Sequence, residues 1–270
     1  MTIVVGVGAP DGLILAADSR TTLLWDGGRH RIISDTAQKL FPVCGKVGVA
    51  TYNDAFIGQR TIAGMMDEFV AQHGDDLPDD AEGIARVLGD FFHERFMADS
   101  LPQILQWCED NPGIGRIGFL VGGYDEDGIG AITEVIIPGP ELTAVDVNTA
   151  TSGVCWRCQT DVIRRLIKGF DMDQFVAAGN DVPDELGAST ALLEYSLLMP
   201  VTVQDAIDLA GFLIRTTIEM QRFSDGTLGN PSSVPGCGGS IRVLSVTRTG
   251  AEWVTVPTLV ADGEIPRSGV

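Results

Sequence analysis

Long apolar runs and basic residues are both scarce in this sequence of 270 residues, and each scarcity excludes a class of function. No stretch reaches the roughly 18 consecutive apolar residues that a membrane-spanning helix needs. Lysine and arginine number 18 against 37 aspartate and glutamate residues, which gives a formal net charge of -19. Nucleic acids and anionic membrane surfaces are bound through basic faces. The composition therefore argues against both kinds of partner and favours a soluble globular protein.

Cysteine and histidine are also scarce, which limits disulfide and metal chemistry. Five cysteines are an odd number and too few for a disulfide framework at this length. Cys155 and Cys158 form a C-x-x-C pair, a spacing that can be redox-active or bind zinc. A zinc site needs two more ligands, and the three histidines are scattered without ligand spacing. We expect a structural pair, with a reversible disulfide as the alternative, and neither a metal nor a cofactor.

The N-terminal segment, Met-Thr-Ile-Val-Val-Gly-Val, has no basic stretch ahead of its apolar run, so it is not typical of a signal peptide. The cytoplasm is therefore the expected location. Gly6 and Gly8 fall inside an apolar run rather than between a strand and a helix, so they form no dinucleotide-binding fingerprint. We expect close backbone approach at these glycines or, alternatively, a substrate that pairs there as an added strand.

The hydrophobic periodicity alternates between strand-like and helix-like segments. Strands are predicted over residues 2–8, 13–18, 40–43, 46–51, 117–122, 131–137, 142–147, 241–246 and 253–256. Helices are predicted over 56–70, 80–96, 160–168 and from 202 onward, where Thr-Val-Gln-Asp approximates a capping box. Residues 21–34 are expected to be a polar connection. The order suits an α/β (α+β) fold, a four-layer αββα sandwich of two mostly antiparallel sheets between helices, in a single domain over 1–270 with a frayed tail at 258–270.

The chemistry-bearing stretch is TIVVGVGAPDGLILAADSR, residues 2–20, which resembles the start of a mature proteasome β subunit, a member of the N-terminal nucleophile hydrolases. That family opens with a nucleophilic threonine on its first strand, here Thr2. A glycine-containing turn, an apolar second strand and an Asp-Ser-Arg triplet follow, and the triplet Asp18-Ser19-Arg20 keeps the family spacing. The block AQKLF resembles the segment with the catalytic lysine, here Lys39, which comes a few residues late because of an insertion at 25–31.

The expected chemistry follows from the position of the threonine. A threonine hydroxyl is a poor nucleophile unless a base takes its proton. Removal of Met1, which the small Thr2 favours, would free an α-amine with a pKa of about 8 as that base. A buried lysine nearby would lower the pKa of the amine by like-charge repulsion, and a carboxylate would hold that lysine. By resemblance, Lys39 and Asp18 fill these two roles.

The resemblance also names supporting residues and shows departures from the family pattern. Thr51 stands about where the family has its oxyanion-hole glycine, and Ser152 matches the serine of a Ser-Gly segment. The block CGGSIRV resembles the glycine-rich entry to a late strand, with Cys237 in place of a serine before Gly238. Val234 stands where an aspartate is expected.

The resemblance implies a threonine peptidase or amidase that hydrolyses peptides or unfolded proteins. It also implies a homo-oligomer, a ring or a related assembly, with an ATP-dependent unfoldase as a candidate partner. The spacing is closer to bacterial β-subunit homologues, including the Anbu (ancestral β subunit) type, than to α subunits. Two alternatives stay open. One is a catalytically weak or silent structural or assembly subunit, favoured by Val234 and Cys237, and the other is a small-amide hydrolase with the same nucleophile.

Overall fold

A computed structural model describes residues 2–24, 30–111, 115–169, 171, 176, 179, 202–224 and 236–254. These residues form a mixed α and β fold in which the pairings within both large sheets are antiparallel, as the periodicity predicts. The tail expected at 258–270 lies outside the described residues, and the single domain stays a prediction. No described helix combines the length and the apolarity that crossing a membrane would require.

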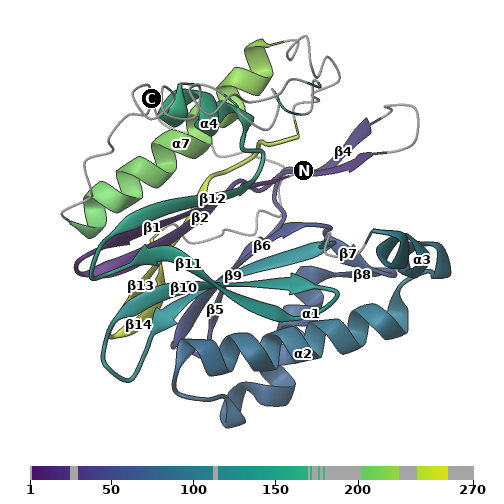
Figure 1. Ribbon diagram of the computed structural model, residues 1–270, viewed down its shortest axis with the longest axis horizontal. Helices are drawn as coiled ribbons and strands as arrows, with labels where there is room; N and C mark the ends of the chain where they lie inside the picture. The colour runs from purple at the N-terminus through teal and green to yellow at the C-terminus, as the bar shows by residue number, and fades with distance from the viewer. Residues whose placement is uncertain are drawn as a thin grey trace, which may run out of the picture.

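The first sheet contains the N-terminal hairpin and is covered on one face by helices α4 and α7 (Figure 1). Ile3 and Val5 pack on the helix side, whereas Val4 between them faces the second sheet, as the alternation of a strand requires. Both faces are therefore buried. The strands lie in the order β12 (Gly153–Cys158), β1 (Ile3–Ala9), β2 (Gly12–Ala17), β13 (Arg242–Thr247) and β14 (Gly250–Trp253), and the helices are α4 (Asp161–Lys168) and α7 (Val203–Phe223).

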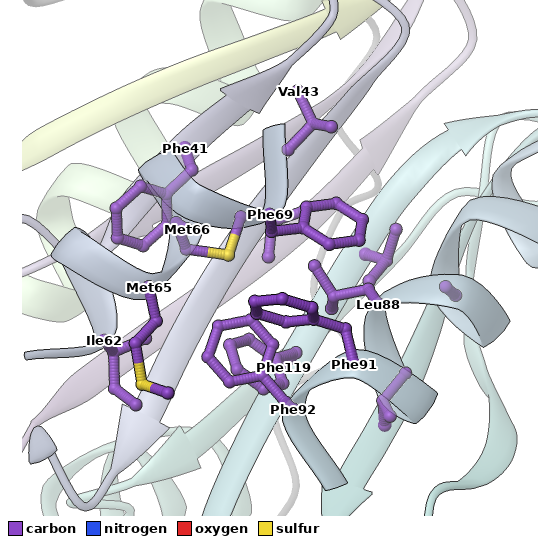
Figure 2. Close-up of a cluster of buried hydrophobic side chains, with 14 of the residues drawn as sticks. Phe41, Val43, Ile62, Met65, Met66, Phe69, Leu88, Phe91, Phe92 and Phe119 are labelled. Carbon is purple, nitrogen blue, oxygen red and sulfur yellow. The ribbon is translucent and has the colours of Figure 1, made fainter. Parts of the chain in front are cut away.

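The second sheet is covered by helices α1 and α2 on its outer face, through a core rich in phenylalanine (Figure 2). Phe69 of α1 and Phe92 of α2 are fully buried there, and the ring of Phe92 lies 4.6 Å from that of Phe119 on the sheet. The strands lie in the order β11 (Glu141–Asn148), β10 (Gly130–Ile137), β9 (Ile117–Tyr124), β6 (Val47–Asn53) and β5 (Leu40–Val43), and the helices are α1 (Ile62–His73) and α2 (Ala81–Asp99).

A third core lies between the two sheets, where Leu15 of the first meets Leu120 of the second. A polar link crosses the same space. The hydroxyl of Tyr52 donates to Glu134, and Arg157 donates to both Glu134 oxygens at 2.5 and 2.8 Å. Burial alone would raise the pKa of Glu134, but the bonds from Arg157 and Tyr52 lower it on balance. The carboxylate is therefore charged at neutral pH and fixes β6, β10 and β12 relative to one another.

The sequence correctly marked where two helices begin. The side chain of Asp80 accepts the N–H of Gly83 at 2.7 Å at the start of α2. At the start of α7, Thr202 and Asp205 form a reciprocal capping box. Such caps satisfy backbone N–H groups that have no partner inside the helix.

Other local predictions were wrong. Residues 21–34, expected as a connection, include the hairpin β3 (Thr21–Leu24) and β4 (His30–Ser34). Phe56 and Ile57, assigned to a helix, form the short strand β7, which pairs with β8 (Arg60–Thr61) before α1 begins. Strand β12, the helix α3 (Pro102–Asp110) and the short 3-10 helix η1 (Gly74–Asp76) were not predicted.

Candidate active site

Thr2 lies at the open end of the β1–β2 hairpin, just before β1, and is 4% exposed. Because the two strands run antiparallel with Val4 opposite Ala17, the residue that follows β2, Asp18, returns to the side of Thr2. The N–H of Ile3 donates to Asp18 Oδ1 at 3.1 Å. The hairpin itself therefore brings Thr2 and Asp18 together.

The carboxylate of Asp18 is fully buried and accepts four hydrogen bonds. Oδ1 accepts from Ile3 N–H and from Lys39 Nζ, at 3.1 and 2.7 Å. Oδ2 accepts from the N–H groups of Arg20 and Gly238, at 3.2 and 2.9 Å. A buried carboxylate with this many donors is held in one orientation. Asp18 therefore holds the backbone of Ile3, Arg20 and Gly238 and the ammonium of Lys39 in place.

Lys39, the residue before β5, is the buried cation of the site. Its side chain is 7% exposed, and Nζ donates to Asp18 Oδ1 at 2.7 Å and to the carbonyl of Arg20 at 2.6 Å. An ammonium has three N–H donors, and these bonds use two of them. Lys39 and Thr2 line the same cleft. The third N–H of the buried ammonium can therefore donate to a group in that cleft.

The glycine pair that precedes β13 closes over Asp18 and Arg20. A Cβ on Gly238 would lie 2.5 Å from Arg20 Cζ, and one on Gly239, whose φ is +73°, would lie 2.3 Å from the carbonyl oxygen of Asp35. Arg20 itself pairs with the Asp35 carboxylate at 2.6 Å. Arg20 and Gly238, both predicted as supporting residues, thus hold the loop that donates to Asp18. Gly239 is needed because a side chain would collide with backbone there, whereas one at Gly238 would displace the guanidinium of Arg20.

A cleft of about 700 Å³ opens beside Thr2 and Lys39. Its walls come from β3, β4, β6, β7, α1 and α3, and they include the exposed apolar side chains Leu23, Ile33, Phe56 and Leu101. Concave surfaces of this size with apolar walls and a few polar groups are typical ligand sites. The cleft is therefore suited to a substrate with apolar side chains.

Thr51 lies in β6 on the wall of this cleft, 6% exposed, and does not have the part that the sequence predicted. Its N–H donates to the carbonyl of Lys39 at 2.8 Å, so it is not free to bind an oxyanion. Its hydroxyl is the one buried side-chain polar atom without a hydrogen-bond partner among the described residues. Thr51 therefore lines the cleft with a buried hydroxyl that has no partner in the described part of the chain.

We expect Thr51→Val to raise the free energy of unfolding by about 1 kcal/mol, because it removes a buried hydroxyl that has no partner. The matched control is Thr217→Val in α7. The hydroxyl of Thr217, also buried, donates to the Leu213 carbonyl at 2.9 Å, so this change should lower stability by about 1 kcal/mol. Urea unfolding measures both. Equal losses for the two variants would show that the Thr51 hydroxyl has a partner.

Two expectations about β1 and its neighbours were wrong. Gly8 lies opposite Gly153 and Ile3 opposite Cys158, so Ser152 sits at the far end of β1, about 23 Å along the strand from Thr2. The serine is therefore not part of this site. A substrate cannot pair with β1 either, because β2 and β12 occupy both of its edges. The close backbone approach expected at the glycines is confirmed at Gly8, where a Cβ would lie 2.5 Å from the Asn148 carbonyl oxygen, but at Gly6 the nearest atoms belong to side chains.

The cysteines near the site are poorly suited to be nucleophiles. Burial, and then the charge of Asp18, raise the pKa of the Cys237 thiol well above its usual value. Burial raises the pKa of Cys155 to about 11 and also raises that of Cys158, whose thiol donates to Asn53 Oδ1 at 2.8 Å. All three are free thiols. Because the thiolate is the reactive form, Cys237 is protonated and unreactive at neutral pH.

Gln159 and Gln221 contact the site but were not predicted. The N–H of Gln159 donates to the carbonyl of Thr2 at 3.0 Å. Gln221 is buried on the apolar stripe of α7, and its side chain binds both Gln159 and the backbone of Cys237. A polar residue on an apolar helical stripe was the signal that could have revealed it.

Within the described ranges, no group of three or more histidine, cysteine, aspartate or glutamate side chains is placed to hold a metal ion. Comparison with known proteins identifies no relative, so the site is interpreted from its geometry alone. No protein-family model matches the chain, and no curated protein matches it at a significant level.

Proposed function

We propose that this protein is an N-terminal threonine hydrolase of the proteasome type, which hydrolyses peptide bonds through Thr2 after removal of Met1. The observation that carries the proposal is the buried pair of Lys39 and Asp18 at 2.7 Å, beside Thr2 and open to a cleft. Burying two charges is costly unless they are paired and hydrogen-bonded. Such a pair at the edge of a substrate-sized cleft is better explained by chemistry than by stability alone.

In the proposed mechanism the free α-amine of Thr2 takes the proton from the Thr2 hydroxyl. The oxygen attacks the carbonyl carbon of the substrate amide, and the C–N bond breaks as the ammonium returns the proton to the leaving amine. An ester on Thr2 remains. A water molecule that gives its proton to the α-amine then hydrolyses this ester. The positive charge of Lys39 favours the neutral amine and stabilises the developing negative charge.

Several features support this assignment beyond the pair itself. The helix-covered sheets, which meet in a shared core, fit a four-layer αββα sandwich of the N-terminal nucleophile type. The apolar walls of the cleft fit a peptide or unfolded protein as substrate. A homo-oligomeric ring, an ATP-dependent unfoldase partner and a cytoplasmic location remain proposals that rest on the resemblance of residues 2–20 and 37–41 to proteasome β subunits.

The proposal is tested by the state of the N-terminus. Protein with Thr2 as its first residue should hydrolyse fluorogenic peptides with apolar side chains. The same protein with an uncleavable residue added before Thr2 should be inactive, because its amine is no longer a free base next to the hydroxyl. Peptide hydrolysis that is unaffected by the added residue would refute the mechanism. A panel of simple amides assayed in parallel separates a peptidase from a small-amide hydrolase.

A structural or assembly subunit without activity is the second candidate. One observation favours it: the residue before Gly238 is the buried, unreactive Cys237 rather than a hydroxyl residue. The same experiment decides between the two candidates. Absence of hydrolysis by an assembled protein whose first residue is Thr2 would favour the structural subunit.

A further inference from the structure

Gln221 is a buried polar residue whose side chain reaches out of its own helix. It lies near the C-terminal end of α7 and is 6% exposed, on the same stripe as Ala210, Ile214 and Thr217. A buried amide is costly unless both its oxygen and its nitrogen find partners. Gln221 finds both partners outside α7, on two segments that are far apart in the sequence.

The two hydrogen bonds determine the orientation of the amide. Oε1 of Gln221 accepts the backbone N–H of Cys237 at 3.0 Å, and Nε2 donates to Oε1 of Gln159 at 2.7 Å. A backbone N–H can only donate, so the oxygen must face Cys237 and the nitrogen must face Gln159. A carboxylate keeps the bond to Cys237 but turns an oxygen toward Oε1 of Gln159, and an apolar side chain of similar size makes neither bond.

Each of these two segments directly binds one member of the candidate catalytic group. The N–H of Gln159 donates to the Thr2 carbonyl at 3.0 Å. The N–H of Gly238, which follows Cys237, donates to Asp18 Oδ2 at 2.9 Å. One side chain therefore links the segment that holds Thr2 to the segment that holds Asp18. Because α7 packs on β1 and β2, the link is anchored on the same sheet that carries both residues.

We propose that Gln221 is a positioning residue of the active site, which acts through Gln159 and Gly238 to fix Thr2 relative to Asp18. The inference rests on the proposed function, since it assigns Gln221 a part in the reaction of Thr2. The link is uncharged. It joins the two segments without adding a second carboxylate near Asp18, Lys39, Arg20 and the thiols of Cys158 and Cys237, which are among the ionisable groups around this loop.

The test compares the same substitution at two glutamines of α7. Gln221→Glu keeps an acceptor for the N–H of Cys237 but turns an oxygen toward Oε1 of Gln159. We expect kcat for a peptide to fall about tenfold or more at pH 8, with KM little changed. The kcat ratio of variant to wild type should rise as the pH is lowered and the new carboxyl group becomes a donor. Gln204→Glu, at an exposed position early in α7, should match the wild type throughout.

A second measurement keeps this inference separate from the proposed function. Amide hydrogen exchange should become about tenfold faster at Gln159 and Gly238 in the Gln221→Glu variant, whereas exchange in β9 should stay unchanged. If the wild-type protein hydrolyses no peptide, the proposed function fails. Amide hydrogen exchange then tests by itself whether Gln221 links the segments of Gln159 and Gly238. Unchanged exchange at both amides would overturn it. A loss of activity that is the same at every pH would also overturn the inference, as would faster exchange throughout the chain. Either result would mean that Gln221 has only a structural role.

Discussion

Thr2→Ala is expected to reduce peptide hydrolysis to the background of the assay, a loss on the order of 10⁴-fold or more, because the only proposed nucleophile is gone. The fold should be unaffected, since no side-chain hydrogen bond of Thr2 stabilises the described structure. Alanine is also small enough for Met1 to be removed, so the N-terminus stays comparable. Hydrolysis of a fluorogenic peptide and urea unfolding measure the two effects.

Two control variants make the Thr2→Ala result specific. Thr2→Ser keeps both the hydroxyl and the α-amine, and should retain activity within about tenfold of the wild type. Cys237→Ala should also retain activity, because the raised pKa keeps that thiol protonated. Activity that survives Thr2→Ala but is lost in Cys237→Ala would contradict our account, because it would make Cys237 the nucleophile.

Asp18→Asn is expected to cost both stability and activity, with a loss of about 3–5 kcal/mol in the free energy of unfolding. An asparagine has one oxygen and one NH₂ group. In either orientation the NH₂ group faces donors, either Ile3 N–H and Lys39 Nζ or the N–H groups of Arg20 and Gly238. In both orientations the variant also leaves the buried ammonium of Lys39 without its carboxylate partner.

Lys39→Met should separate the two effects. The Asp18 carboxylate keeps three backbone N–H donors after this change, so the loss of stability should be smaller than in Asp18→Asn. Peptide hydrolysis should still fall by about 10²–10³-fold, because the buried positive charge is gone. Urea unfolding and kcat/KM for both variants check this order. A Lys39→Met protein that unfolds more easily than Asp18→Asn would mean that the pair is chiefly structural.

The parts of the fold that the sequence predicted are those with a strong local signal. Pro10-Asp11-Gly12 between two apolar runs predicted the hairpin of β1 and β2, and the Thr202 capping box marked the start of α7. Strand β4 was missed for a physical reason. Four of its five residues are exposed, so its sequence carries no alternation of buried and exposed positions.

The site shows the same division between local and long-range information. Thr2 and Asp18 meet because one hairpin joins them, and the sequence placed them in one site through the resemblance of residues 2–20 to proteasome β subunits. Ser152 was misplaced because a Ser-Gly match does not show which end of β1 the turn will face. The link through Gln221 depends on a helix that packs against segments 62 and 16 residues away, which no local pattern reveals.

The central claim is that Thr2 is a free N-terminal nucleophile, and the most direct test is the intact mass of the protein before and after treatment with a peptide epoxyketone. Our account predicts a chain that lacks Met1 and gains one adduct, which maps to Thr2 and is absent in Thr2→Ala. A chain that lacks Met1 and gains no adduct across a series of such reagents would contradict it and would favour a structural subunit.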